Sequence, residues 1–199
     1  MNGKRALLLV DVQNDFCPGG TLPVPEGDRV IDPLNRVIAL SLAAGWPIFA
    51  SRDWHPPHTS HFAGQGGIWP AHCVQQTSGA DFHPGLRLPE SVVVVSKGTD
   101  PQADGYSAFE AVSAGGKTLA EMLAAAGVED LLVGGLATDY CVRATVLEAL
   151  RLGFSVTLLE DGAAGVEIKP GDSQRAVEEM RQGGAAVLRV DDLGTPDRP

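Results

Sequence analysis

The run Ala6-Leu7-Leu8-Leu9-Val10-Asp11 is the clearest indication of the fold class, because five apolar residues in a row end abruptly at a carboxylate. An unbroken apolar run of this length is typical of a strand that is buried on both faces, as in a parallel sheet. Similar short runs recur along the chain and alternate with segments whose apolar residues have helical spacing. The further predicted strands are 47–50, 92–95, 131–133, 155–159 and 185–190, and the predicted helices are 28–44, 119–126, 139–152 and 173–182.

This alternation predicts an α/β fold with three layers, in which helices cover both faces of a six-stranded, mainly parallel sheet. The chain has 199 residues and shows neither repeats nor a linker, which favours a single domain over residues 1–199. A domain of this size buries about 70% of its unfolded surface and needs no disulfide or structural metal to fold. We expect a loose polar tail over residues 191–199.

The charge balance excludes several classes of partner. Lys and Arg number 15 against 25 Asp and Glu, which gives a net charge of −10. This balance argues against binding to nucleic acid or to an anionic membrane. No apolar run approaches the ~18 residues of a membrane span, and the run that ends at Val10 is too short for a signal peptide. The three cysteines are an odd number, so we expect no disulfide framework and a cytoplasmic location.

Reactive side chains follow four of the predicted strands. Asp11 follows the first, Asp53 the second, Lys97 the third and Cys141 the fourth, where it begins a helix. Ligands of open α/β sheets bind outside the carboxyl ends of the strands, so we expect these four residues to converge on one cleft. Cys141 lies off the apolar face of its helix, and its place in the first helical turn is one that lowers the pKa of a thiol.

Each residue of this group has a chemical interpretation beside an ordinary structural one. A partly desolvated Asp11 has a raised pKa and can act as a general base toward Cys141, while Lys97 favours the thiolate and holds Asp11 in place. The loop 134–138 before Cys141 supplies backbone N–H groups for an oxyanion hole. Taken singly, the same residues could be a turn carboxylate, a solvated lysine and a buried structural cysteine.

The histidines are concentrated in one long connection between the second and third predicted strands. They are His55, His58, His61, His72 and His83. Asp53 and His55 are two residues apart and therefore share one side of an extended segment, and His61 and His72 can fold back to meet them. A carboxylate with imidazoles suits zinc, iron or manganese. Spacing alone does not choose the ligands from five histidines, and surface histidines without a metal remain the alternative.

Nucleotide-binding motifs are missing from the sequence. Gly116-Lys117-Thr118 looks like the end of a phosphate-binding loop, but Ala111 stands where the motif needs its first glycine. No G-x-G-x-x-G segment follows the first strand, so a dinucleotide site is unsupported.

Further motifs occur in a fixed order over nearly the whole chain up to Val190. They are DVQNDFCPGG at 11–20, DWH at 53–55, HF at 61–62, WPAHC at 69–73, ADFHP at 80–84, KG at 97–98, YSAF at 106–109 and GLATDYCV at 135–142. Together they resemble the nicotinamidases, also called pyrazinamidases, of the isochorismatase-like cysteine hydrolase superfamily. The resemblance implies a Rossmann-like fold and a metal-assisted hydrolysis of nicotinamide to nicotinate and ammonia in NAD salvage, with pyrazinamide as a further substrate.

The resemblance also implies roles for the matching residues. Cys141 would be the nucleophile, Asp11 the base and Lys97 the third member of a catalytic triad. The backbone N–H groups of Ala137 and Cys141 would form the oxyanion hole, and the Leu136–Ala137 peptide is expected to be cis. One divalent ion, zinc before iron or manganese, would be bound by Asp53, His55, His61 and His72. The pyridine pocket would be lined by Phe16, Leu22, Trp69, Tyr106 and Ala137.

Three other functions are weighed against this one. An N-carbamoyl-amine amidohydrolase or an isochorismatase is not expected to carry the cluster of Asp53, His55 and His61. A metal hydrolase whose bound water attacks the substrate would leave Cys141 passive. A metal-binding or ligand-sensing module without turnover would not need both Asp11 and Lys97. The expected partner is a small amide, and the chain is expected to be a monomer or a homodimer.

Overall fold

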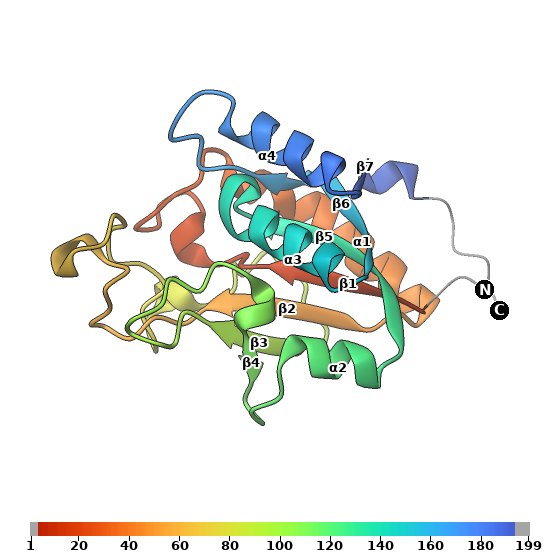
Figure 1. The fold of residues 1–199 in the computed structure, drawn as a ribbon, viewed down its shortest axis with the longest axis horizontal. Coiled ribbons are helices and arrows are strands. Elements are labelled where there is room, and N and C mark those ends of the chain that lie inside the picture. Colours follow the sequence, from red (N-terminus) through yellow and green to blue (C-terminus); the bar gives the residue numbers. More distant parts are fainter. Residues whose placement is uncertain (1–3, 194–199) are drawn as a thin grey trace.

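The computed structural model describes residues 4–193, which form three layers around a seven-stranded sheet (Figure 1). The strands are β1 (Lys4–Val10), β2 (Ile48–Asp53), β3 (Val93–Lys97), β4 (Val112–Ser113), β5 (Val128–Leu136), β6 (Ser155–Ala164) and β7 (Ala186–Leu188). Their order in the sheet is β4-β3-β2-β1-β5-β6-β7, and β4 alone among these runs antiparallel to its neighbour. The predicted α/β/α class is confirmed.

The predicted count of six strands is wrong, because β4 was missed. This strand has only two residues and pairs with Val95 and Ser96 at the edge of the sheet. Two residues are too few to show the apolar pattern by which a strand is recognised in a sequence.

Helices cover both faces of the sheet, and the alternation of side chains along β1 shows how. The helices are α1 (Ile31–Ala44), α2 (Leu119–Ala125), α3 (Arg143–Arg151) and α4 (Asp172–Gln182). Leu7 and Leu9 point into the core beneath α1, whereas Leu8 and Val10 point into the core beneath α2, α3 and α4. Both cores are built mainly from buried aliphatic residues, so the sequence of β1 is continuously apolar although its side chains alternate between two faces.

The ends of the helices follow from local chemistry. At the start of α2, Thr118 accepts a hydrogen bond from the N–H of Glu121, whose side chain accepts from the N–H of Thr118. Helix α1 ends at Gly45 in the left-handed conformation that glycine adopts without steric cost. The predicted helix over 139–152 is split, because a π-helical turn over Thr138–Val142 precedes α3.

The strand order creates a switch point at the centre of the sheet. From β1 the chain adds β2 and β3 on one side, and it later returns to place β5 on the other side of β1. Loops that leave the carboxyl ends of β1 and β5 therefore diverge and open a crevice between them. Asp11 follows β1 and Cys141 follows β5, so both residues lie at this crevice.

The long connection from β2 to β3 is folded back on the sheet by short turns and isolated bridges, such as His55 with Val74. Near the other end of the chain, Val190–Asp192 form a 3-10 turn, and the N–H of Val190 donates to Asp161 at 2.9 Å. The expected loose tail therefore begins with an ordered turn, and residues 194–199 lie outside the described residues. None of the described helices is long and apolar enough to cross a membrane.

Candidate active site

Three buried side chains from the ends of three strands meet at the switch point. The Nζ atom of Lys97 lies 2.7 Å from Oδ2 of Asp11 and donates a hydrogen bond to Sγ of Cys141 at 3.3 Å. A carboxylate oxygen of Asp11 and Sγ of Cys141 lie within 4.8 Å of each other. The structure thus brings the predicted nucleophile, base and lysine into one cluster, in which no side chain is more than 7% exposed.

The backbone at Asp11 orients its carboxylate. Asp11 has φ of 50°, a left-handed conformation that aspartate tolerates better than most residues, and its N–H donates to the carbonyl of Ser51. The hydroxyl of Ser51 donates to Oδ1 of Asp11 at 2.7 Å, which leaves Oδ2 facing Lys97 and Cys141. Ser51 lies within β2 and has no local sequence signal, so its contact with Asp11 was missed.

Burial and the neighbouring charges together set the protonation of this cluster. It raises the pKa of Asp11 to about 6, although the ammonium of Lys97 opposes the shift. Burial lowers the pKa of Lys97, but the carboxylates of Asp11 and Asp53 outweigh it and raise that pKa well above its usual value. Burial also raises the pKa of Cys141 well above that of an ordinary thiol, so the expected lowering at a helix start is wrong. A thiol that stays protonated needs a base beside it.

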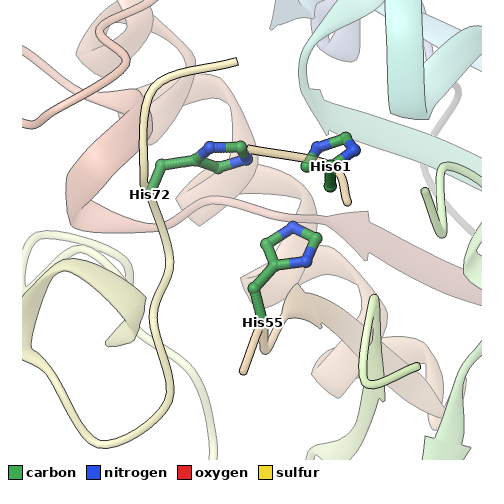
Figure 2. Close-up of side chains that lie close together, drawn as sticks. All are labelled: His55, His61 and His72. Carbon is green, nitrogen blue, oxygen red and sulfur yellow. The ribbon is translucent and has the colours of Figure 1, made fainter. Parts of the chain in front are cut away.

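A second cluster, of three buried imidazoles, lies next to the first. Nitrogen atoms of His55, His61 and His72 lie within 4.8 Å of one another, and Figure 2 shows the rings grouped around a common space. Oδ2 of Asp53 lies 3.6 Å from Nε2 of His55 and 4.0 Å from Nε2 of His72. The four residues predicted to bind a metal are therefore neighbours, although Asp53 ends β2 and the three histidines are spread over the long connection that follows it.

The hydrogen bonds of the three rings leave one nitrogen of each available. Nδ1 of His55 lies 3.0 Å from the carbonyl of Gly98, and Nδ1 of His72 lies 2.8 Å from the carbonyl of Pro70. Nδ1 of His61 lies 2.8 Å from a carboxylate oxygen of Asp104. Because these oxygens only accept, each Nδ1 carries the proton and each Nε2 presents a lone pair.

This donor set fits a divalent transition metal ion. Within residues 4–193, nothing hydrogen-bonds to the buried Nε2 of His55, which is costly unless a cation takes its lone pair. Burial lowers the pKa of His72 to about 4 and also lowers that of His61, so both rings are neutral at pH 7, as an imidazole must be to bind a metal. Three imidazoles and one carboxylate are ligand types that zinc binds in tetrahedral sites.

Asp53 joins the two clusters. Its Oδ1 accepts a hydrogen bond from the ammonium of Lys97, while its Oδ2 faces the imidazoles. Burial raises the pKa of Asp53, but Lys97 together with His55 and His72 outweighs that effect and holds the pKa below its usual range, so the carboxylate is charged. The side-chain amide of Gln13 donates to the carbonyl of Asp53 and accepts from the N–H of Asp53, both at 2.8 Å. Gln13 lies inside the first quoted motif, but no role for it was predicted.

An aromatic pocket opens onto both clusters. The indole N–H of Trp69 donates to the hydroxyl of Tyr106 at 2.9 Å, and the ring of Trp69 meets that of Tyr140 edge-on. All five residues predicted for substrate contact lie on its wall, while Tyr140 and Val166 were missed. Tyr140 could have been found from its place beside Cys141, whereas Val166 comes from the loop after β6 and carries no signal. The full lining is Phe16, Leu22, Asp53, His61, Trp69, His72, Tyr106, Ala137, Tyr140, Cys141 and Val166.

Other candidate residues of the sequence are not members of the two clusters. His58 contacts the exposed Gln65, and Nδ1 of His83 accepts from the N–H of Gly85. Cys17 and Cys73 are buried, and none of the three cysteines forms a disulfide within the described residues. The Leu136–Ala137 peptide is cis, as expected, and it leads directly into the turn that carries Cys141.

Comparisons with known proteins agree with this geometry. The isochorismatase domain family matches residues 5–192. The nicotinamidase of Escherichia coli strain K12 is 45% identical over 94% of this chain and 96% of its own length. The pyrazinamidase of Pyrococcus horikoshii, solved in complex with zinc, has 47% identity and a TM-score of 0.86 over 94% of this chain and 99% of that one. The PnC1 protein of L. infantum, solved with nicotinate, has 37% identity and a TM-score of 0.84 over 94% and 93%.

Proposed function

The chain belongs to the isochorismatase family, and from this we propose that it is a nicotinamidase that hydrolyses nicotinamide to nicotinate and ammonia. The observation that carries the proposal is the shared Asp53, which links a buried Asp11–Lys97–Cys141 cluster to three imidazoles at one aromatic pocket. Pyrazinamide, an amide on a similar ring, is proposed as a second substrate. The nicotinamidase of Escherichia coli, the pyrazinamidase of Pyrococcus horikoshii and the nicotinate-bound protein of L. infantum each align with nearly the whole chain.

Acylation begins with the protonated thiol of Cys141. Asp11 removes the proton from Sγ, and the ammonium of Lys97, 3.3 Å away, stabilises the thiolate that forms. The thiolate attacks the amide carbon, and the backbone N–H groups of Ala137 and Cys141 hold the oxyanion, each worth roughly 10²–10³ in kcat. Asp11 then gives its proton to the amide nitrogen, the C–N bond breaks, ammonia leaves and a thioester remains on Cys141.

Deacylation uses Asp11 as the base a second time. Asp11, again a carboxylate, takes a proton from water, and the water oxygen attacks the thioester carbon. The C–S bond breaks, Asp11 returns its proton to the sulfur of Cys141, and nicotinic acid leaves, which gives its remaining proton to the solvent or to ammonia and becomes nicotinate. Lys97 keeps its proton throughout, because Asp11 and Asp53 hold its pKa well above its usual value, and the thiolate of Cys141 takes the place of the Asp11 charge while Asp11 is protonated.

Asp53, His55, His61 and His72 are proposed to hold one zinc ion, with iron and manganese as alternatives. When bound, the ion supplies a Lewis-acidic positive centre at the pocket wall that can hold the electron-pair-donating ring nitrogen of the substrate. The aromatic side chains Phe16, Trp69 and Tyr106 would then orient the ring and exclude water.

The proposed location of the reaction is the cytoplasm. The support is the odd number of cysteines and the absence of any disulfide among the described residues.

The test is to measure ammonia and nicotinate released from nicotinamide by the purified, zinc-loaded protein. We expect equal amounts of both products, and loss of both after Cys141→Ala. Adding hydroxylamine should divert product to the hydroxamate, because it captures the thioester. Turnover without hydroxamate and with Cys141→Ala active would favour water attack at the metal instead. No turnover by folded, zinc-loaded protein would contradict the nicotinamidase proposal, and carbamoyl amines would be tested next.

A further inference from the structure

We propose that Asp104 is a positioning residue of the metal centre, which strengthens zinc binding by accepting the Nδ1 proton of His61. The proposal rests on the metal site of the proposed function and assigns a role to a residue outside the motifs that identify the family. It also makes the metal centre depend on one segment, residues 98–105, whose two ends are buried and whose middle is mostly exposed.

The three imidazoles are not held alike. His55 and His72 each face a neutral backbone carbonyl through Nδ1, whereas His61 faces the carboxylate of Asp104 at 2.8 Å. A hydrogen bond to an ionised acceptor is about twice as strong as one between neutral groups. A carboxylate that accepts a hydrogen bond from Nδ1 also makes Nε2 of the same ring more basic, and thus a better metal ligand. His61 is therefore expected to bind a metal most strongly of the three.

The Asp104 contact crosses from the surface to the interior. The side chain of His61 is 3% exposed, but that of Asp104 is 60% exposed. No other part of the histidine cluster reaches the surface in this way among the contacts of the described residues, because the carbonyls of Gly98 and Pro70 belong to the backbone. The carboxylate can therefore be changed with little effect on the core.

The segment 98–105 is built to lie against the histidines. Gly98 has φ of 63°, and a Cβ atom there would lie 2.4 Å from a ring carbon of His55. Gly105 has φ of 72°, and a Cβ atom there would lie 2.5 Å from the backbone nitrogen of Gly98. Only glycine fits either place, so the segment closes on itself directly over the ring of His55. The segment supplies two oxygen atoms that accept hydrogen bonds from Nδ1 of a histidine. These are the carbonyl oxygen of Gly98, for His55, and a carboxylate oxygen of Asp104, for His61.

A further set of hydrogen bonds fixes the backbone beside His61 independently of Asp104. The carbonyl of Pro101 accepts from the N–H of Ser60 at 2.9 Å, from its hydroxyl at 3.1 Å and from the hydroxyl of Thr59 at 3.2 Å. The hydroxyl oxygen of Thr59 accepts from the N–H of His61 at 3.3 Å. The main chain of His61 should hold its place when Asp104 is replaced, so a substitution reports on the ring's hydrogen bond.

The same segment offers a matched control. Asp100 is also acidic and exposed, but its carboxylate accepts from the N–H of Gln102 and makes no contact with a histidine. Asp100→Asn removes one negative charge from the segment, as Asp104→Asn does, without touching the metal ligands. Asp104→Asn keeps an oxygen that can accept the proton, and Asp104→Ala removes the acceptor entirely.

The experiment measures zinc affinity by competition with a chromophoric chelator, together with the melting temperature of each metal-free protein. We expect Asp104→Ala to bind zinc 10–100-fold more weakly than the wild type, Asp104→Asn to fall between them, and Asp100→Asn to match the wild type. The melting temperatures of the metal-free proteins should agree. Equal affinity of the wild type and Asp104→Ala would overturn the inference, as would a lowered melting temperature of metal-free Asp104→Ala. A wild type that binds no zinc would overturn the metal site itself, while turnover of nicotinamide tests the proposed reaction separately.

Discussion

Asp53 and Lys97 lie opposite each other at the ends of the parallel strands β2 and β3, and their side chains form a buried ion pair. Their strand register places them there, because β2 and β3 end at the same edge of the sheet. The carboxylate of Asp53 faces the imidazoles and also contacts the ammonium of Lys97, which in turn faces Cys141. The predicted metal centre and the predicted nucleophile are therefore electrostatically coupled through this ion pair.

Asp53→Ala should damage both halves of the site. Removing one member of a buried ion pair costs about 3–5 kcal/mol, because the charge of Lys97 stays buried with fewer partners. We expect that loss in urea unfolding of the metal-free protein, together with loss of zinc binding and of turnover. Asp100→Asn, on the surface, is the control and should change none of the three. Wild-type stability of metal-free Asp53→Ala would contradict the coupling.

The rate should fall in acid because Asp11 must be ionised to accept the thiol proton. Burial raises its pKa to about 6, so kcat/KM should be constant above that pH and fall as the pH drops below it. The hydroxyl of Ser51 donates to the ionised form and lowers this pKa, so Ser51→Ala should move the acid limb to higher pH. The measurement is a pH profile of kcat/KM for both proteins under the same zinc loading. A limb that stays in place or moves to lower pH in Ser51→Ala would argue against Asp11 as the base.

The sequence alone locates the cluster of Asp11, Lys97 and Cys141, because a parallel sheet brings the carboxyl ends of its strands together. Continuous apolar runs locate those ends, and the reactive residue that follows each run is then placed within a few residues. The edge strand β4 is too short to leave such a pattern. The roles of these residues stay predictions until the variants are measured.

The hydrogen bonds that support the site residues could not be predicted from local sequence patterns. Ser51, Gln13 and Asp104 act through hydrogen bonds to partners about 40 positions away in the chain. Likewise, spacing left five candidate histidines, and only the path of the long connection separates His61 and His72 from His58 and His83. Such contacts depend on how loops fold over the sheet, which periodicity does not encode.

Removing the metal should destabilise the protein and weaken substrate binding. An ion bound only by the folded state stabilises it by RT ln(1 + [zinc]/Kd), about 2.7 kcal/mol at a free zinc concentration 100 times Kd. For a domain of this size that is roughly 5–10 °C in Tm. Chelation followed by calorimetry should show this loss, and zinc should restore it. A chelated protein with unchanged Tm and unchanged KM for nicotinamide would contradict a metal in the pocket.

Tyr140 should limit the size of the substrate. Its ring contacts Trp69 on the pocket side, and the residue also lines a wider neighbouring cleft of about 450 Å³ with Arg143, Ile168 and Lys169. Tyr140→Ala should join the two spaces and admit amides on larger rings, such as quinoline-3-carboxamide.

We expect the ratio of kcat/KM for that amide to kcat/KM for nicotinamide to rise about tenfold or more in Tyr140→Ala, since relief of steric misfit is worth about 1–3 kcal/mol. Tyr140→Phe keeps the ring and should leave the ratio unchanged, which separates the effect of volume from that of the hydroxyl. If both variants raised the ratio equally, the hydroxyl would set the limit. If neither raised it, the boundary of the pocket would lie with Trp69 and Tyr106, whose side chains hydrogen-bond to each other beside Tyr140.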